Sequence, residues 1–357
     1  MDGKLDDEQE MIVQTVRRFA DRDLRGWGAE ADRSGAAPDR LTAAASELGF
    51  FLDAVPASAD GLLEGDYAHV TRALRGYELG RGCAALAALL ETNVEPALAV
   101  GAWGTSAAKQ QVFGALASGG LATFGHDSRG ALEVTESGGE LRITGKVGPL
   151  PALGVASHLV LAVRDALVVI SLDGVRREAI VPSGWRAAKW GIAHLDGQRV
   201  PAELVLTRDA AAVTEVLSWA RVSLAARAAG VATAALDHAE AYARERVQFG
   251  HPIGQFEALI RLRDDAMTSA IAARVFALHA AWAIDARRPE AADLASRARV
   301  LAGDAVAKAT VDAVQIYGGY GFVTDFPVEK LMRDARAFEA LHGDERLGRI
   351  LAAKGAK

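Results

Sequence analysis

Apolar residues recur every three or four positions through the first 120 residues, the spacing of one helical face. The first such stripe comprises Met11, Ile12, Val16, Phe19 and Leu24. The same period returns in residues 41–48, 67–79 and 84–90. Asp66 and Ser106 have side chains suited to accept from the first free N–H groups of a helix, so we expect them to be N-caps. The pattern predicts an N-terminal helical domain.

The pattern changes near Leu121 to short apolar runs of the kind found in strands. Two strands should flank a Ser-Gly-Gly turn within residues 134–145. Residues 158–163 and 166–171 are further apolar runs, and Asp165 lies at the turn between them. The run beginning at Leu204 closes this region, which we interpret as a small β domain.

Helical periodicity returns at Ala212 and persists. Three long and two short helices are expected, at residues 213–247, 255–286, 289–317, 328–341 and 344–354. The chain therefore belongs to the α+β class by pattern. The predicted domains are an N-terminal helical domain (1–120), a middle β domain (121–210) and a C-terminal helical bundle (211–357).

Composition narrows the class of protein. Half of the 357 residues are hydrophobic, only 6% are aromatic, and the formal net charge is −6. That charge argues against a nucleic-acid partner, which calls for a basic surface. Cys83 is the single cysteine, so neither a disulfide framework nor a thiolate metal site is expected. The sequence begins without a signal-like apolar run and has no long uninterrupted apolar stretch, so we expect a cytoplasmic protein without a membrane partner.

Short sequence motifs of common metal, phosphate and dinucleotide sites are absent from the sequence. It has neither a zinc-protease helix motif nor a phosphate-binding loop ending in Gly-Lys-Ser/Thr. Gly319-Tyr-Gly321 lacks the third glycine of a dinucleotide fingerprint and follows a helix instead of a strand. The run from Gly125 to Ser128 contains His and Asp, but the members of a catalytic triad are rarely adjacent in sequence. We interpret that run as a loop.

Two segments carry candidate chemistry. Residues 244–250 end a long helix with a guanidinium, an amide and an aromatic ring before a glycine. Arg246 is suited to bidentate contacts with a phosphate, and Phe249 to packing against a ring. Residues 315–322 end another helix with consecutive glycines, which permit close approach of a ligand to the backbone. Taken singly, each segment is also explained by a helix C-cap and a surface ion pair.

Together the two segments resemble the signature pair of the acyl-CoA dehydrogenase family. Residues 246–254 read Arg-Val-Gln-Phe-Gly-His-Pro-Ile-Gly, and residues 315–322 read Gln-Ile-Tyr-Gly-Gly-Tyr-Gly-Phe. The resemblance extends through residues 327–335 and 104–113. It implies an N-terminal helical domain, a middle β-barrel, a C-terminal four-helix bundle and the cofactor FAD. It also implies that the adenosine diphosphate end of FAD is held by a neighbouring subunit, through Arg246, Gln248, Phe249, Gln315, Gly318 and Gly319.

The family removes the α-proton of an acyl-CoA thioester with a glutamate, and this chain departs from that pattern. The usual base position is His342, and the alternative position, just before Arg221, is Ala220. An ordinary imidazole has a pKa of about 6.5, so His342 is a candidate base. Glu339, one turn earlier, is the nearest carboxylate in sequence. The other interpretation is that His342 only fills space at an interface.

The middle domain departs as well. The family loop that touches flavin and substrate is shortened to residues 125–128, and the strand positions of its Trp and Thr are Gly148 and Leu150. These losses resemble the non-catalytic subunits of heteromeric (α2β2) acyl-CoA dehydrogenases of steroid degradation. The resemblance implies an acyl-CoA substrate, with steroid-CoA as one candidate, and a homologous partner subunit or a homo-oligomer. Two alternatives stay open: a self-sufficient flavoenzyme (oxidase or monooxygenase), and a structural subunit without cofactor.

Overall fold

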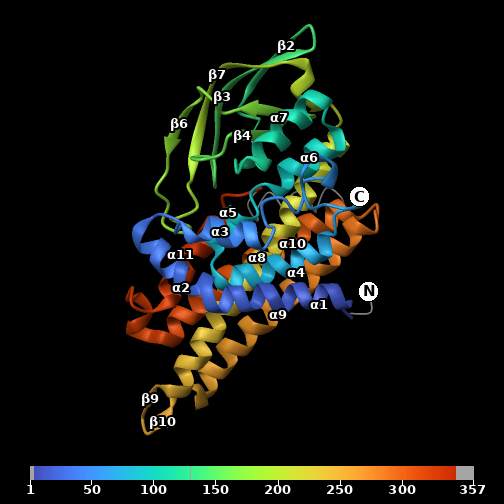
Figure 1. The fold of residues 1–357 in the computed structure, drawn as a ribbon. Coiled ribbons are helices and arrows are strands. Elements are labelled where there is room, and N and C mark those ends of the chain that lie inside the picture. Colours follow the sequence, from blue (N-terminus) through green and yellow to red (C-terminus); the bar gives the residue numbers. More distant parts are fainter. Residues whose placement is uncertain (1–3, 129, 343–357) are drawn as a thin grey trace.

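The computed structural model describes residues 4–128 and 130–342 (Figure 1). The N-terminal part is helical. Its helices are α1 (Asp7–Phe19), a π-helical turn (Ala20–Leu24), α2 (Arg25–Ser34), α3 (Arg40–Glu47), α4 (His69–Gly82), α5 (Ala84–Leu90), α6 (Val94–Trp103) and α7 (Ser106–Ala117). The predicted stripe is confirmed in part, because Val16, Phe19 and Leu24 are buried whereas Met11 is 62% exposed.

Both predicted N-caps are wrong. Thr105, not Ser106, caps α7, and its hydroxyl accepts from the Ala108 N–H. Helix α4 begins at His69, three residues after Asp66, so the Asp66 side chain does not reach its N–H groups. The carboxylate of Asp285, from the far end of the chain, instead accepts from the backbone N–H groups of His69 and Val70, at 2.8 and 2.9 Å. A capping partner this distant in sequence carries no local signal.

The middle region consists of two four-stranded sheets, ordered β1-β4-β5-β8 and β2-β3-β7-β6. Their strands are β1 (Ala122–His126), β2 (Glu133–Ser137), β3 (Glu140–Leu150), β4 (His158–Val163), β5 (Ala166–Ser171), β6 (Arg176–Ala179), β7 (Gly191–Val200) and β8 (Val205–Thr207). The predicted Ser-Gly-Gly turn is confirmed, because Ser137 pairs with Glu140 across two glycines with positive φ. The predicted loop at residues 125–128 is wrong in its first half: Gly125 and His126 belong to β1, which pairs in parallel with β4.

The C-terminal part consists of α8 (Ala210–Glu245), the hairpin β9 (Val247–Gln248) and β10 (His251–Pro252), α9 (Glu257–Asp285), α10 (Ala291–Tyr317), a 3₁₀ turn (Gly318–Phe322) and α11 (Pro327–Phe338). Figure 1 shows the sheets at one end of the molecule and the β9–β10 hairpin at the other. The last predicted helix, at residues 344–354, lies outside the described residues.

Helix α8 forms the central axis of the fold. It has 36 residues and so extends about 54 Å at 1.5 Å per residue. Alanine and glycine allow its neighbours to approach closely. A methyl group added at Gly230 of α8 would lie 2.1 Å from the Tyr77 carbonyl oxygen of α4, and one added at Gly80 would lie 2.3 Å from the Arg227 carbonyl oxygen. The backbones of α4 and α8 are thus in direct contact.

Helix α9 is long and apolar enough, by length and composition, to cross a membrane, but the most apolar part of it is 33% buried within the chain. Core helices of soluble proteins can have the same length and apolar composition. Helix α9 packs against α8 and α10 here, and its apolar outer positions include Ile271 and Val275, each more than half exposed. Exposed apolar residues on a packed helix are typical of a surface that another protein chain covers.

The contact between α4 and α8 gives a direct test of stability. Gly230→Ala should lower the free energy of unfolding by about 1–3 kcal/mol, because the new methyl group overlaps the Tyr77 carbonyl and the helices must separate. Gly114→Ala in α7, where a methyl group meets nothing within 4 Å, should be neutral or stabilise by up to about 1 kcal/mol. Urea unfolding of both variants measures the difference, and equal stabilities would contradict the proposed close contact.

Candidate functional site

The six residues that the family resemblance assigns to FAD lie together at one end of the helical bundle. Arg246 follows the last residue of α8, Gln248 is in β9, and Phe249 lies in the turn before β10. Gln315 is in the last turn of α10, and the following turn begins with Gly318 and Gly319. Figure 1 places this end, marked by the β9–β10 hairpin, away from both four-stranded sheets.

Aromatic contacts hold the two segments side by side. The ring of Tyr242, on α8, stacks on that of Tyr317, on α10, with centroids 4.2 Å apart. The guanidinium of Arg246 lies over the Tyr320 ring at 5.5 Å. Because Gly318 and Gly319 lie between Tyr317 and Tyr320, these contacts bring the glycines next to Arg246. Segments about 70 residues apart in sequence thus form one surface.

The chemistry of this surface fits a diphosphate. All six side chains or backbones are exposed, and among the described residues Arg246 has no carboxylate partner. Gly318 has a φ of +59°, and a methyl group added at Gly318 or Gly319 would meet nothing within 4 Å, so a ligand can reach the backbone. A free guanidinium beside an open glycine backbone supplies charged and neutral N–H donors of the kind that bind phosphate oxygens. Phe249, 91% exposed, is available to a ring.

The base position lies far from this surface. Ala220 and Arg246 are 26 residues apart along α8, a rise of roughly 39 Å. That separation exceeds the reach of one extended FAD molecule. The surface around Arg246 therefore cannot hold the end of a flavin whose ring lies beside Ala220 of the same chain.

His342 lies just beyond α11, next to the sheet and to α8. Its φ of +53° takes it out of the helix, and its ring stacks on Phe124 of β1 with centroids 5.6 Å apart. The Nε of Arg221 donates to the His342 carbonyl oxygen at 3.3 Å. Burial, followed by the positive charge of Arg221, lowers the pKa of His342 well below 6.5. The imidazole is therefore neutral at pH 7, as a base requires, but binds a proton only weakly.

Glu339 lies on the surface and away from His342. It is exposed, and its carboxylate pairs with Arg336 at 2.5 Å. The expected helical relation to His342 fails because α11 ends at Phe338, three residues earlier than the predicted end at Leu341. The described geometry thus gives Glu339 no contact with the base position.

A second histidine, His126, lies close to His342 and Arg221, and it belongs to the run 125–128 that the sequence analysis interpreted as a loop. His126 ends β1, and its Nδ1 is buried without a hydrogen-bond partner in the described structure. Burial, with a smaller effect from Arg221, lowers the pKa of His126 to about 4. Burial and Arg299 lower the pKa of Arg221 to about 10. Both histidines thus lie beside the positive charge of Arg221, and the nearest carboxylates of the cavity lining are Glu91 and Glu95, away from the two family base positions in the sequence.

Little space remains beside His342. The cavity there measures about 40 Å³, and its lining includes Thr92, Thr123, Trp185, Glu91 and Arg227. A drug-sized ligand occupies roughly 300 Å³ or more. This cavity is large enough for a water molecule but too small for an acyl chain.

A buried ion-pair cluster fills the adjoining space. The Glu91 carboxylate accepts from Arg75 at 3.1 Å and from the Ser223 hydroxyl at 3.1 Å, and lies 3.8 Å from Arg227 Nε. Burial alone would raise the pKa of Glu91, but the charges of Arg75, Arg72 and Arg227 lower it overall. Arg227 is the least compensated member, because burial lowers its pKa whereas the pKa values of Arg72 and Arg75 are raised by neighbouring carboxylates. The signal in the sequence is its position, an arginine inside the run Ala225-Ala226-Arg227-Ala228-Ala229.

The predicted losses in the middle domain have a structural counterpart. A methyl group added at Gly148 would lie 2.6 Å from the Gly191 carbonyl oxygen, so this position packs against β7 and offers no aromatic wall. Leu150 is 7% exposed and belongs to the core. Neither residue supplies a polar group to a flavin ring.

The helical, sheet and helical-bundle architecture is that of the acyl-CoA dehydrogenase class of FAD-dependent enzymes, and the surface around Arg246 has donors suited to a diphosphate. Family models agree: the N-terminal domain of acyl-CoA dehydrogenase matches residues 6–120, and its C-terminal domain matches residues 210–356. A relative from Bacillus subtilis (strain 168), "Probable acyl-CoA dehydrogenase YngJ", is 30% identical over 99% of each chain. This chain belongs to the acyl-CoA dehydrogenase family, whose cofactor is FAD.

Other relatives and solved structures are similar over the whole length. "Acryloyl-CoA reductase (NADH)" of Anaerotignum propionicum is 28% identical over 99% of this chain and 95% of that one. The structure of a glutaryl-coenzyme A dehydrogenase with glutaryl-CoA superposes with a TM-score of 0.88 at 27% identity, covering 99% of this chain and 96% of that one. Butyryl-CoA dehydrogenase from Megasphaera elsdenii, at 23% identity and a TM-score of 0.89 over 100% of each chain, has the same fold.

The partly buried His126 of β1 predicts a pH dependence. His126 is neutral in the fold and has a pKa of about 4, against about 6.5 when unfolded, so the unfolded chain binds more protons between those values. The contribution of His126 to the free energy of unfolding is therefore complete above about pH 6.5. It is lost as the pH falls towards 4, at no more than about 1.4 kcal/mol per pH unit. His126→Phe should flatten the pH profile of urea unfolding by that amount. Parallel profiles for the two proteins would contradict the assignment.

Proposed function

We propose that this chain is the base-lacking subunit of a heteromeric acyl-CoA dehydrogenase and completes the FAD site of a homologous, base-bearing partner. The observation that carries the proposal is the contrast between the two ends of α8. Arg246, just past one end of α8, offers accessible phosphate donors, whereas the part of α8 around Ala220 has no carboxylate at either family base position and only a small cavity beside it.

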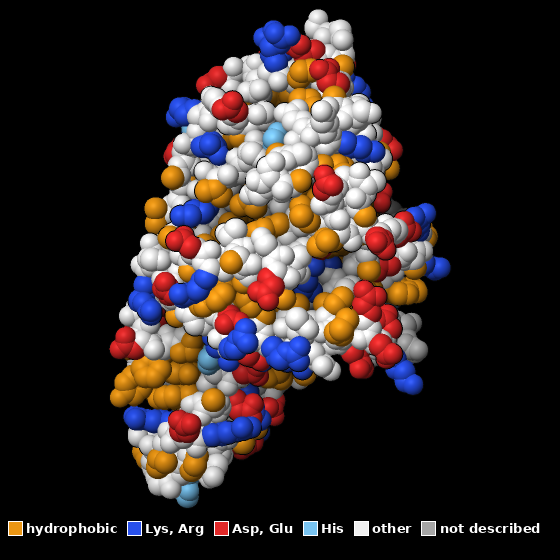
Figure 2. Space-filling view, in the orientation of Figure 1, with side chains coloured by type: hydrophobic (Ala, Val, Ile, Leu, Met, Phe, Trp, Pro, Cys, Tyr) orange, Lys and Arg blue, Asp and Glu red, His pale blue; other side chains and the backbone are white. Residues whose placement is uncertain are grey.

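An apolar surface next to Arg246 supports a partner chain. The exposed residues there are Val247, Phe249, Tyr320, Phe322 and Val323. Figure 2 shows hydrophobic side chains gathered towards this lower end of the molecule. Such a patch is costly in water and is typical of a protein interface. A partner that covers it would also bring its own cofactor within reach of Arg246 and the glycine backbone.

The missing glutamate at both family base positions, Ala220 and His342, supports the absence of dehydrogenation within this chain. When bound, FAD would supply the acceptor for a hydride from the β-carbon of the acyl group, and a base would have to remove the α-proton. His342 is a weak proton acceptor among Arg221 and His126, and Glu339 pairs with Arg336 on the surface. We infer that the partner supplies the base and that this chain contributes orientation and charge to its cofactor.

For the substrate of the assembly we propose a bulky acyl-CoA of the steroid class. The proposal depends on the likeness of the losses at the base position and in the middle domain to steroid-type subunits. The cavity of this chain adds no support for any acyl group. A cytoplasmic location and an α2β2 assembly belong to the same proposal, with a homo-oligomer as the alternative outcome.

Loss of the phosphate-binding guanidinium should remove FAD from the assembled complex. Arg246→Ala, co-expressed with a base-bearing paralogue, should lower the FAD content of the purified complex at least fivefold, because charge-assisted hydrogen bonds to phosphate are lost. Arg244→Ala, two residues away, removes an exposed pair with Glu240 and should leave the FAD content unchanged. Absorbance at the flavin band per chain is the measurement.

The same experiment separates the alternatives. The wild-type chain alone should bind FAD weakly, and the complex should hold fewer FAD molecules than chains. A fully loaded, active homotetramer of this chain would refute the partner role and favour a self-sufficient flavoenzyme. Unchanged FAD content in the Arg246→Ala complex would favour a structural subunit.

The small cavity beside His342 predicts how the chain responds to acyl-CoA. Wild-type protein should show no gain in affinity from CoA to butyryl-CoA to octanoyl-CoA in calorimetric titrations. Arg227→Ala removes the least compensated guanidinium and leaves Glu91 paired with Arg75, so the site should open and affinity should rise with chain length. Chain-length dependence in the wild type would show that its own site binds the acyl group.

A further inference from the structure

Helix α9 has an outer face that the rest of the described chain leaves uncovered. Its inner face is a row of buried alanines, and the helix packs against α8 and α10. The outer face carries Thr268, Ile271, Ala272 and Val275, all exposed, with Ile271 at 54% and Val275 at 57%. Only 33% of the most apolar stretch of α9 is buried within the chain. An apolar face of this kind is unfavourable in water unless another surface covers it.

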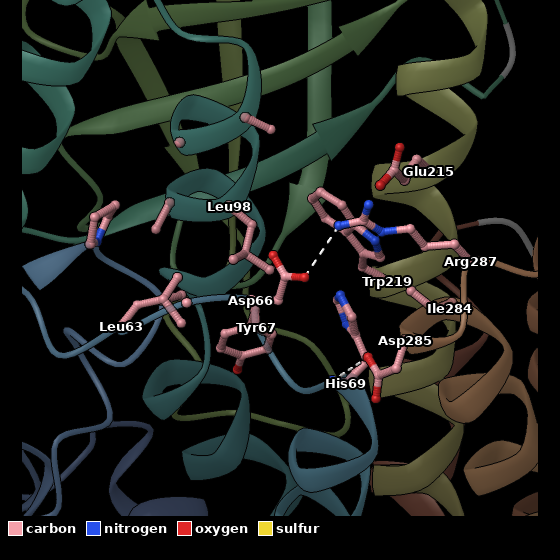
Figure 3. A pocket seen from close by; sticks show the side chains of 16 residues that line it. Leu63, Asp66, Tyr67, His69, Leu98, Glu215, Trp219, Ile284, Asp285 and Arg287 are labelled. Carbon is pink, nitrogen blue, oxygen red and sulfur yellow. Dashed lines mark hydrogen bonds and ion pairs between the residues drawn. The ribbon is translucent and has the colours of Figure 1, made fainter.

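Both ends of α9 are held by the rest of the fold. At the C-terminal end, the Asp285 carboxylate accepts from the backbone N–H of His69 at 2.8 Å (Figure 3). Arg287, just beyond the helix, pairs with Asp66 at 3.2 Å. At the N-terminal end, the 3₁₀ turn Ile253–Gln255 follows the β9–β10 hairpin and contacts α8. The outer face is therefore a fixed surface that α9 presents to another molecule.

Charged and polar groups bound this face at its two ends and are missing from its middle. Asp264 and Asp265 lie towards the N-terminal end of α9, and His279 lies towards the C-terminal end; all three are exposed. Between Asp265 and His279, Arg274 is the only charged residue in the sequence. Its guanidinium lies over the Tyr77 ring of α4, 4.2 Å from the centroid, and so away from the middle of the outer face.

This pattern is self-complementary about the midpoint between Ile271 and Ala272. Asp264 lies seven residues before Ile271, and His279 lies seven residues after Ala272. In an antiparallel pair of α9 helices with a twofold axis at that midpoint, Asp264 of each copy faces His279 of the other. An imidazole N–H donates to a carboxylate whether the ring is neutral or charged. The small side chain of Ala272 at the axis allows the two helices to approach closely.

The outer face of α9 is separate from the surface around Arg246. That surface adjoins the β9–β10 hairpin, which precedes the first residue of α9, Glu257. Glu257 and Ile271 are 14 residues apart, a rise of roughly 21 Å along the helix. One chain thus has two distinct surfaces, and each is free to contact a different subunit.

We propose that the outer face of α9 binds a second copy of this chain as an antiparallel, twofold-symmetric helix pair centred between Ile271 and Ala272. The place of this contact in the assembly rests on the proposed function: two pairs of unlike subunits, each sharing a flavin at the Arg246 surface, are joined into α2β2 through α9. The self-complementary spacing of Asp264 and His279 selects a copy of the same chain over an unrelated protein. The exposed aspartates disfavour a membrane surface of anionic lipid.

Cross-linking of the purified full-length chain tests the position of the axis. The single cysteine, Cys83, is buried, so an introduced cysteine is the only accessible thiol. Ala272→Cys should form a disulfide-linked dimer on oxidation with diamide, because the two thiols meet at the axis. Ala258→Cys, exposed on the same helix, places the two thiols about 40 Å apart in the proposed pair and should stay unlinked. Non-reducing gel electrophoresis measures the linked fraction.

Substitutions at the face test its energetics by sedimentation of the same chain. Ile271→Asp places two carboxylates at the axis and should weaken self-association at least about tenfold. Val181→Asp, at a residue 91% exposed beyond β6, should leave self-association unchanged. His279→Asp sets carboxylate against carboxylate and should weaken pairing about tenfold, and the addition of Asp264→Lys should restore it. Circular dichroism melting verifies that each variant is folded.

The α9 pairing and the shared flavin can fail separately. In the co-expressed complex, Ile271→Asp should convert α2β2 into an αβ pair that keeps its FAD, whereas Arg246→Ala should lower the FAD content and leave the α9 contact intact. A wild-type chain that is monomeric at micromolar concentration would overturn the α9 pairing, as would equal cross-linking at positions 258 and 272. Failure of Asp264→Lys to rescue His279→Asp would overturn the antiparallel register. Binding to vesicles of anionic lipid in place of self-association would overturn the choice of a second copy.

Discussion

The backbone contact between α4 and α8 is the constraint on which the rest of the structure depends. Gly80 and Gly230 allow the two helices to touch, and α8 is buried over most of its 36 residues as a result. A straight helix of that length fixes the separation between its two ends. The residues near Ala220 and those near Arg246 are therefore held apart, whatever the side chains around them do. The distance between the residues near Ala220 and those near Arg246 is therefore set by the backbone of α8.

Burial of α8 also explains the free-energy cost of the charged Arg227 near its centre. Arg227 cannot reach water from a helix that is covered on most sides, so its charge has to be met inside the protein. The Glu91 carboxylate compensates the charge of Arg227 only partly, because it lies 3.8 Å from the Arg227 Nε. The same carboxylate forms closer contacts with Arg75 and Ser223. A cluster of this kind stabilises the fold less than apolar packing of the same volume would. Its presence beside His342 is consistent with a space that acyl chains do not use.

The opposite end of α8, at Arg246, carries exposed groups. Exposed aromatic residues and an unpaired arginine would be unfavourable on an isolated chain, but they suit a surface that a second subunit and its cofactor cover. The outer face of α9, with Ile271 and Val275 exposed, is a further apolar area of the bundle. The small cavity beside His342 and the exposed apolar residues around Arg246 are what we expect of the proposed subunit, which would complete the cofactor site of a partner.

The order of elements, the Ser-Gly-Gly turn and the family signature were determined by the sequence itself, because helical periodicity, glycine conformation and a contiguous motif are local properties. The tertiary structure alone decided that Asp285 caps α4, that α11 stops before Glu339 can reach His342, and that His126 lies beside Arg221. It also decided that Arg227 occupies the space next to His342. Each of these depends on contacts between residues distant in sequence, and the spacing of residues along the chain carries no information about which distant groups a packed core brings together.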